Sequence, residues 1–137
     1  LLPVPQAEVR RSGERVLLLA IGDRVEAAEE AAERLVKEGL NPTVVNARFL
    51  KPLDETTLLA ELKRHALVVT VENHVVAGGF GSAVNELLLA NRLGDRRVIN
   101  LGFPDKFIEH GSPAQLFARY KLDATGIVQT VLGAIHK

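Results

Sequence analysis

The sequence predicts an α/β domain: a three-layer α/β/α sandwich around a mostly parallel, mixed sheet. Short apolar runs, typical of strands buried on both faces, alternate along the chain with amphipathic segments of helical spacing. Strands that alternate with helices favour a parallel sheet with right-handed crossovers. The chain has 137 residues, 47% of them hydrophobic, which suits one core and one domain of the usual size, roughly 100 to 200 residues. We therefore predict a single domain over residues 1–137.

The first half of the chain contains two strand-helix units. Val16–Ile21 is an uninterrupted apolar run, and the amphipathic segment 23–38 follows it and stops at Gly39. Residues 43–50 are rich in β-branched side chains and predict a second strand, after which Asp54 starts a helix.

The amino-terminal residues and the second half complete the expected element order. Residues 1–12 form a lead-in linker with a possible edge strand over Ala7–Arg10. A capping serine, a proline at the first helical position and a glutamine at the third predict a helix start at 112–115. The other expected elements are a strand over 67–71, a long loop over 72–81, a helix over 82–93, a strand over 98–101 and a last helix from near Asp123.

Composition excludes several classes of protein. Seventeen basic residues balance seventeen acidic ones, so no field attracts nucleic acid or an anionic membrane. No apolar run approaches the roughly 18 residues that span a bilayer. The absence of cysteine excludes disulfides and thiolate chemistry and fits a reducing compartment, so we expect a soluble, cytoplasmic protein. The chain lacks methionine and opens with leucine, and we expect it to be part of a longer product.

A glycine-rich segment after the third strand is the first candidate site. It contains Gly78, Gly79 and Gly81, and the next helix is expected to begin at Ser82. Glycines permit positive φ and close backbone approach, and free N–H groups at a helix start can hold an anion. The segment nevertheless lacks the third glycine of a dinucleotide-binding fingerprint. We favour a structural loop or subunit contact, with direct ligand binding as the alternative.

Histidines and acidic residues supply the other candidates. The four histidines are scattered and predict no metal site. Glu72 and His74 fall on one side of an extended segment, where a surface pair is favoured over a catalytic base. Glu109 and His110 follow the fourth strand and face a neighbouring domain or an active site, the former being favoured. The candidate loop and interface residues are Glu72, Asn73, His74, Gly78, Gly79, Gly81, Glu109 and His110. We predict no catalytic, cofactor-binding or metal-binding residue.

Several segments resemble a known family. Asn-Ala-Arg-Phe-Leu-Lys-Pro-Leu-Asp at 46–54, Val-Glu-Asn-His at 71–74 and Gly-Gly-Phe-Gly-Ser-Ala-Val at 78–84 resemble the C-terminal domains of the transketolase superfamily. The run Pro-Asp-Lys-Phe-Ile-Glu-His-Gly at 104–111 is similar to the 1-deoxy-D-xylulose-5-phosphate synthases within it. The chain departs from that pattern at Lys121, where a glycine is expected.

The resemblance implies a five-stranded mixed sheet whose first short strand, here Ala7–Arg10, is antiparallel. It implies a parent enzyme that condenses pyruvate with D-glyceraldehyde 3-phosphate, using thiamine diphosphate and Mg²⁺ held by the preceding domains. This chain alone would bind neither and be inactive, and it would pack against those domains and a second subunit of a homodimer.

Two other functions remain open. One is the C-terminal domain of a 2-oxoacid dehydrogenase beta subunit, which would act as a partner-docking module. The other is a stand-alone nucleotide-binding protein that uses 78–82.

Overall fold

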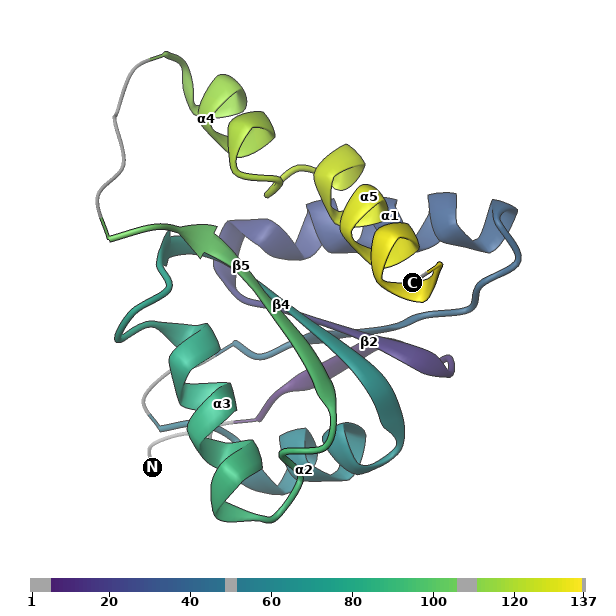
Figure 1. Cartoon of the computed structure of the whole chain (residues 1–137), viewed down its shortest axis with the longest axis vertical. Coiled ribbons are helices and arrows are strands. Elements are labelled where there is room, and N and C mark those ends of the chain that lie inside the picture. The colour runs from purple at the N-terminus through teal and green to yellow at the C-terminus, as the bar shows by residue number, and fades with distance from the viewer. Residues whose placement is uncertain (1–5, 49–51, 106–110, 137) are drawn as a thin grey trace.

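A five-stranded mixed sheet lies between two layers of helices in the computed structural model (Figure 1), which describes residues 6–48, 52–105 and 111–136. The strand order is β1-β3-β2-β4-β5, with β1 antiparallel to β3 and the other neighbours parallel. The strands are β1 Glu8–Arg11, β2 Arg15–Ala20, β3 Thr43–Asn46, β4 His65–Val75 and β5 Arg97–Phe103. The helices are the short 3₁₀ turn η1 Gly22–Arg24, α1 Val25–Lys37, α2 Glu55–Lys63, α3 Phe80–Ala90, α4 Pro113–Arg119 and α5 Ala124–Ile135. The predicted fold class is confirmed.

Burial of β2 on both faces explains its uninterrupted apolar sequence. Val16, Leu18 and Ala20 pack into the core under α1 and α5, whereas Leu17 and Leu19 pack into the core under α2 and α3. All five residues are at most 1% exposed. Alternation of side chains across a strand therefore supplies apolar contacts to both helical layers.

The edge strand is confirmed, but the predicted length of the second strand is wrong. β1 pairs antiparallel with β3, within one residue of the expected bounds. β3 ends at Asn46, because Arg48 adopts a left-handed φ of 65° and its N–H donates to Asn46 Oδ1 at 3.0 Å. A side-chain turn therefore replaces the ladder at this point. Residues 49–50 of the predicted strand lie outside the described residues.

The predicted loop over 72–81 is wrong at both of its ends. β4 continues to Val75, which pairs with Phe103 of β5 after an irregularity in register. α3 begins at Phe80, inside the predicted loop, and ends at Ala90, where Arg92 turns left-handed with a φ of 60°. Six of the ten residues of the predicted loop are therefore regular structure.

Side-chain caps fix the starts of three helices, as the sequence predicted. Asp54 accepts a hydrogen bond from the Thr57 N–H at 3.1 Å, and Asp123 accepts one from the Gly126 N–H at 2.9 Å. Ser112 begins α4 with a complete capping box. Each such cap contributes about 1 kcal/mol to stability.

The position of β2 in the sheet creates the place where a site is expected. β2 lies between β3 and β4, and the helices that follow β2 and β4 cover opposite faces. Open α/β sheets place ligands at such a switch point, beyond the carboxyl ends of the strands.

Replacing Lys121 with glycine should raise the free energy of unfolding by about 1 kcal/mol. Lys121 has a φ of 62°, which costs an ordinary side chain about 1 kcal/mol and glycine almost nothing. Urea denaturation of the wild type and Lys121→Gly measures the gain. Lys121→Ala is the control, since alanine keeps the strain, and an equal gain for both variants would contradict the explanation.

Candidate functional site

A hollow of about 320 Å³ opens at the carboxyl ends of β2 and β4. The elements around it are the end of β4, the η1 turn after β2 and the first residue of α3. Three of the predicted candidate residues, Glu72, Asn73 and His74, line it. The full lining is Ile21, Gly22, Asp23, Glu72, Asn73, His74 and Phe80.

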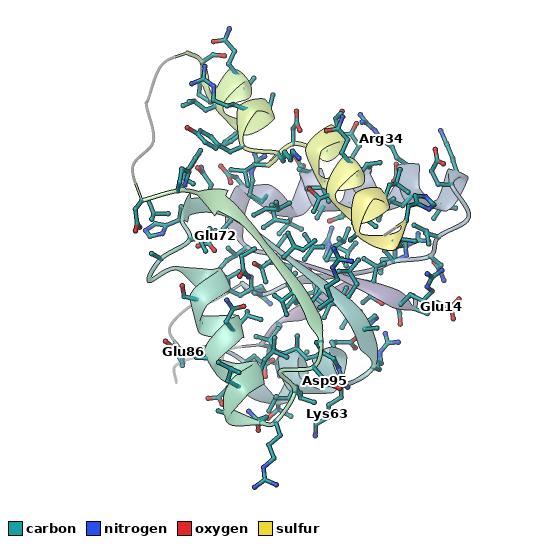
Figure 2. The ribbon with its side chains drawn as sticks, in the orientation of Figure 1. Glu14, Arg34, Lys63, Glu72, Glu86 and Asp95 are labelled. Carbon is teal, nitrogen blue, oxygen red and sulfur yellow. The ribbon has the colours of Figure 1, made fainter. Side chains whose placement is uncertain are left out.

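Glu72 is the buried centre of this region. The residue is 1% exposed, and its carboxylate accepts hydrogen bonds from the Phe80 N–H at 2.8 Å and the Gly81 N–H at 2.7 Å. Figure 2 shows Glu72 beside the start of α3. The residue before α3 is Gly79, which has no side chain to cap the helix. Glu72 therefore supplies, from a neighbouring strand, the acceptor that the first turn of a helix requires.

Three glycines make room for this carboxylate. A Cβ atom on Gly79 would overlap Glu72 Oε1, one on Gly81 would lie 3.0 Å from Oε2, and one on Gly102 would lie 3.1 Å from Cγ. We call Glu72 with Gly79, Phe80, Gly81 and Gly102 the Glu72 cradle. The close backbone approach expected of this loop is present, and the group approached is a side chain of the protein itself.

Positive φ does not explain two of the loop glycines. Gly78 is left-handed, with a φ of 74°, but Gly79 has a φ of −97° and Gly81 lies within α3. The requirement at Gly79 and Gly81 is for space. The sequence did not reveal it because the atoms that need this space belong to a residue on another element.

Burial raises the pKa of the Glu72 carboxyl above its ordinary value of 4.5. The two backbone N–H groups and the nearby His74 act in the opposite direction, because they favour the charged form. The effect of desolvation is larger than the effect of these groups, so the folded protein disfavours ionisation of the Glu72 carboxyl.

His74 and Asn73 occupy the more open part of the hollow. The prediction of a surface pair is wrong, because Glu72 is buried under the start of α3. His74 Nδ1 lies 3.9 Å from Glu72 Oε1, so the two side chains do share a side, but only His74, with its side chain 66% exposed, lies at the surface. His74 Nδ1 is also 2.6 Å from the Val75 carbonyl oxygen. Asn73 donates to Asp23 Oδ2 at 3.1 Å and joins β4 to the η1 turn.

Sequence reasoning missed Asp23, although a usable signal existed. Gly22 and Asp23 directly follow the first buried strand, and parallel neighbours end at the same edge of a sheet. Glu109 and His110 lie outside the described residues, so their expected role at an interface stays a prediction.

The cradle limits what this region can bind. α3 presents its amino-terminal N–H groups to an anion, and Glu72 already occupies that position. A phosphate placed there would face a buried carboxylate at close range, which is electrostatically unfavourable. Within residues 6–48, 52–105 and 111–136, no three acidic or histidine side chains gather as metal ligands would. No helix in this part of the chain has the length and apolar character to cross a membrane.

Comparison with known proteins gave a family match and close relatives. The model of the family "Transketolase, C-terminal domain" matches residues 5–127. The 1-deoxy-D-xylulose-5-phosphate synthase of Desulforudis audaxviator is 50% identical over 94% of this chain and 20% of that protein. The synthase of Caldanaerobacter subterraneus is 48% identical over 95% of this chain and 21% of that protein. The chain thus spans about a fifth of the length of the curated relatives it matches.

Solved structures share the fold. A split-gene transketolase chain, described as an inactive beta4 tetramer, has a TM-score of 0.86 and 34% identity over 99% of this chain and 44% of that chain. The transketolase of Campylobacter jejuni has a TM-score of 0.61 and 24% identity over 94% of this chain and 18% of that chain. The second likeness concerns the fold alone.

Proposed function

The chain belongs to the transketolase C-terminal domain family, and from this premise we propose that it is the C-terminal domain of a 1-deoxy-D-xylulose-5-phosphate synthase. Identity of 50% and 48% to two such synthases over nearly the whole chain supports the proposal. These relatives favour the synthase over the beta subunit of a 2-oxoacid dehydrogenase.

The parent enzyme would condense pyruvate with D-glyceraldehyde 3-phosphate, giving 1-deoxy-D-xylulose 5-phosphate and CO₂. Thiamine diphosphate, with Mg²⁺, would supply the carbanion chemistry of that reaction. The described residues of this chain do not fit that group, because Glu72 fills the one helix start that a glycine-rich loop prepares for an anion. We therefore derive no step of the reaction from this chain.

The role we propose for this chain is structural. Residues 1–137 would form one domain that packs against the other domains of a cytoplasmic homodimer and helps to hold the cofactor sites in shape. The single observation that carries this role is the Glu72 cradle, in which the elements of an anion site serve to fasten α3 to β4. The same observation counts against a stand-alone nucleotide-binding protein.

The isolated chain would be inactive. The split-gene transketolase chain, which contains this fold, is described as an inactive beta4 tetramer. Calorimetric titration of the 137-residue chain with thiamine diphosphate and Mg²⁺ should give no binding heat. Micromolar binding would contradict the proposal.

A domain exchange tests the parent activity directly. The segment of the Desulforudis audaxviator synthase that matches this chain is replaced by residues 1–137, and product formation from pyruvate and D-glyceraldehyde 3-phosphate is measured. The chimera should fold and remain active, because the proposed role needs only correct packing. The control chimera carries the equivalent domain of a 2-oxoacid dehydrogenase beta subunit and should lose activity. A folded chimera with residues 1–137 that makes no product would overturn the assignment.

A further inference from the structure

A buried histidine at the opposite end of the sheet, where the parallel strands begin, has no part in the proposed function. His65 is the first residue of β4 and directly follows the carboxyl end of α2. It is 1% exposed, and it is the only histidine among the buried residues of the described part of the chain.

Hydrogen bonds fix the tautomer of this ring. His65 Nδ1 lies 2.6 Å from the Glu61 carbonyl oxygen, and Nε2 lies 2.7 Å from Thr43 Oγ1. A carbonyl oxygen only accepts, so Nδ1 carries the proton and donates it. In a neutral ring Nε2 is then an acceptor, and the Thr43 hydroxyl donates to it.

The Thr43 hydroxyl continues the chain of hydrogen bonds to the turn between β1 and β2. Thr43 Oγ1 accepts from the Gly13 N–H at 2.9 Å. The donors therefore point in one direction, from Gly13 to Thr43 to His65 and on to Glu61. Arg64 holds the same turn, donating to the Gly13 carbonyl and to Ser12 Oγ, each at 3.0 Å.

We propose that His65 is an acid-sensitive latch: through Thr43 it holds the turn at residues 12–14 against the amino-terminal ends of β3 and β4, and protonation of His65 releases the turn. A proton added at Nε2 turns that atom into a donor, and the bond to Thr43 must reverse. The Thr43 hydroxyl proton then needs another acceptor, although Thr43 is fully buried and its oxygen already accepts from Gly13. An unpaired buried hydroxyl is costly, so the protonated latch opens.

Neighbouring charges and burial set the pH range of the latch. Burial lowers the pKa of His65 from 6.5, and the charge of Arg64 acts in the same direction. The hydrogen bond to the Glu61 carbonyl oxygen acts against them, as does the Glu61 carboxylate, with Oε2 3.9 Å from Nδ1. Other charged groups on the surrounding elements are Glu14 and Arg15 at the start of β2, Lys63 at the end of α2, and Asp95 and Arg96 before β5.

The direction of the pH effect follows from these shifts. Opening the turn removes part of the burial that lowers the pKa of His65, so the closed latch holds a lower pKa than the open form does. The open form therefore binds the proton more readily below pH 6.5. The population of the open form should rise as the pH falls through this range, by at most about tenfold per pH unit, and should level off below the pKa of the closed form.

Amide hydrogen exchange of the 137-residue chain between pH 7.5 and 5 tests the latch. The Gly13 amide should exchange faster than the core amide of Leu18, which reports global unfolding. After correction for intrinsic rates, the protection of the Gly13 amide should fall as the pH is lowered, by at most about tenfold per pH unit. His65→Gln keeps an acceptor for Thr43 but does not titrate, so its Gly13 protection should be independent of pH.

The ring itself provides an independent readout. The nitrogen chemical shifts of His65 at pH 7.5 should identify Nδ1 as protonated and Nε2 as unprotonated. The proposal is overturned if Nε2 carries a proton at that pH, if Gly13 exchanges only as slowly as Leu18, or if its protection does not change with pH in the wild type.

Discussion

Replacing Glu72 with alanine should lower the free energy of unfolding by about 2 to 4 kcal/mol. The variant leaves the Phe80 and Gly81 N–H groups without an acceptor, and each buried, unpaired donor costs about 1 to 3 kcal/mol. Removal of a buried charge offsets part of that loss. Urea denaturation followed by circular dichroism measures the change, and the Phe80 and Gly81 amides should lose exchange protection.

Two further variants make the test specific to the cradle. Glu72→Gln keeps the shape of the side chain, but its NH₂ group faces one of the two donors, so its loss should lie between zero and that of the alanine variant. Glu33→Ala removes an exposed glutamate from α1 and should change stability by less than about 0.5 kcal/mol. Equal effects at Glu72 and Glu33 would contradict the role of the cradle.

The pH dependence of Glu72 has the opposite sign to that of His65. The folded-state pKa of Glu72 is raised above 4.5, so the folded state binds its proton more tightly than the unfolded state. The stability that this group contributes should fall as pH rises from 4.5 through the folded-state pKa, and then level off. The difference between wild type and Glu72→Gln isolates this effect, because both proteins retain His65.

Replacing Gly79 with valine should cost about 3 kcal/mol or more, and alanine nearly as much. A Cβ atom at this position overlaps Glu72 Oε1 and would lie 2.6 Å from the Val75 carbonyl oxygen. Overpacking of this kind typically costs about 1 to 3 kcal/mol, and here it also displaces the cap of α3. Thermal and urea denaturation measure the loss.

Substitutions at two other glycines distinguish the cost of steric overlap at Gly79 from the cost of backbone strain. Gly78 has a φ of 74° with open space around it, so Gly78→Ala should cost only about 1 kcal/mol. Gly133 lies in α5 with nothing near its Cβ position, and Gly133→Ala should stabilise the chain by about 0.5 to 1 kcal/mol. If Gly79→Ala costs no more than Gly78→Ala, the overlap explanation is wrong.

The sequence predicted the parts of the fold that depend on local pattern. β2 is apolar throughout because both of its faces are buried, and that pattern is visible in one short segment. Ser112 and Gln115 lie three residues apart and cap each other. Lys121, in contrast, replaces an expected glycine, and only the structure shows that its backbone remains left-handed.

The errors arose where an element depends on distant partners. The carboxyl end of β4 is polar, so its sequence alone predicts a loop. Its pairing with β5 and the hydrogen bonds of Glu72 to α3 are tertiary contacts, which local pattern does not show. The chain of hydrogen bonds through His65 joins it to Glu61 and Thr43, and Thr43 to Gly13. These residues come from three separate segments, so no local spacing could have indicated the latch.

The Glu72 cradle changes how glycine-rich turns in other chains should be interpreted. A turn of small residues that leads into a helix is commonly taken as a receptor for nucleotides, yet here an acidic residue eight positions before the first helical N–H plays the part of the nucleotide phosphate. A search of uncharacterised sequences for nucleotide-binding turns should therefore check whether the preceding strand carries an acidic residue that can accept the N–H groups of the helix start. Where such an acidic residue is present, the glycine-rich turn stabilises the fold and does not bind a metabolite.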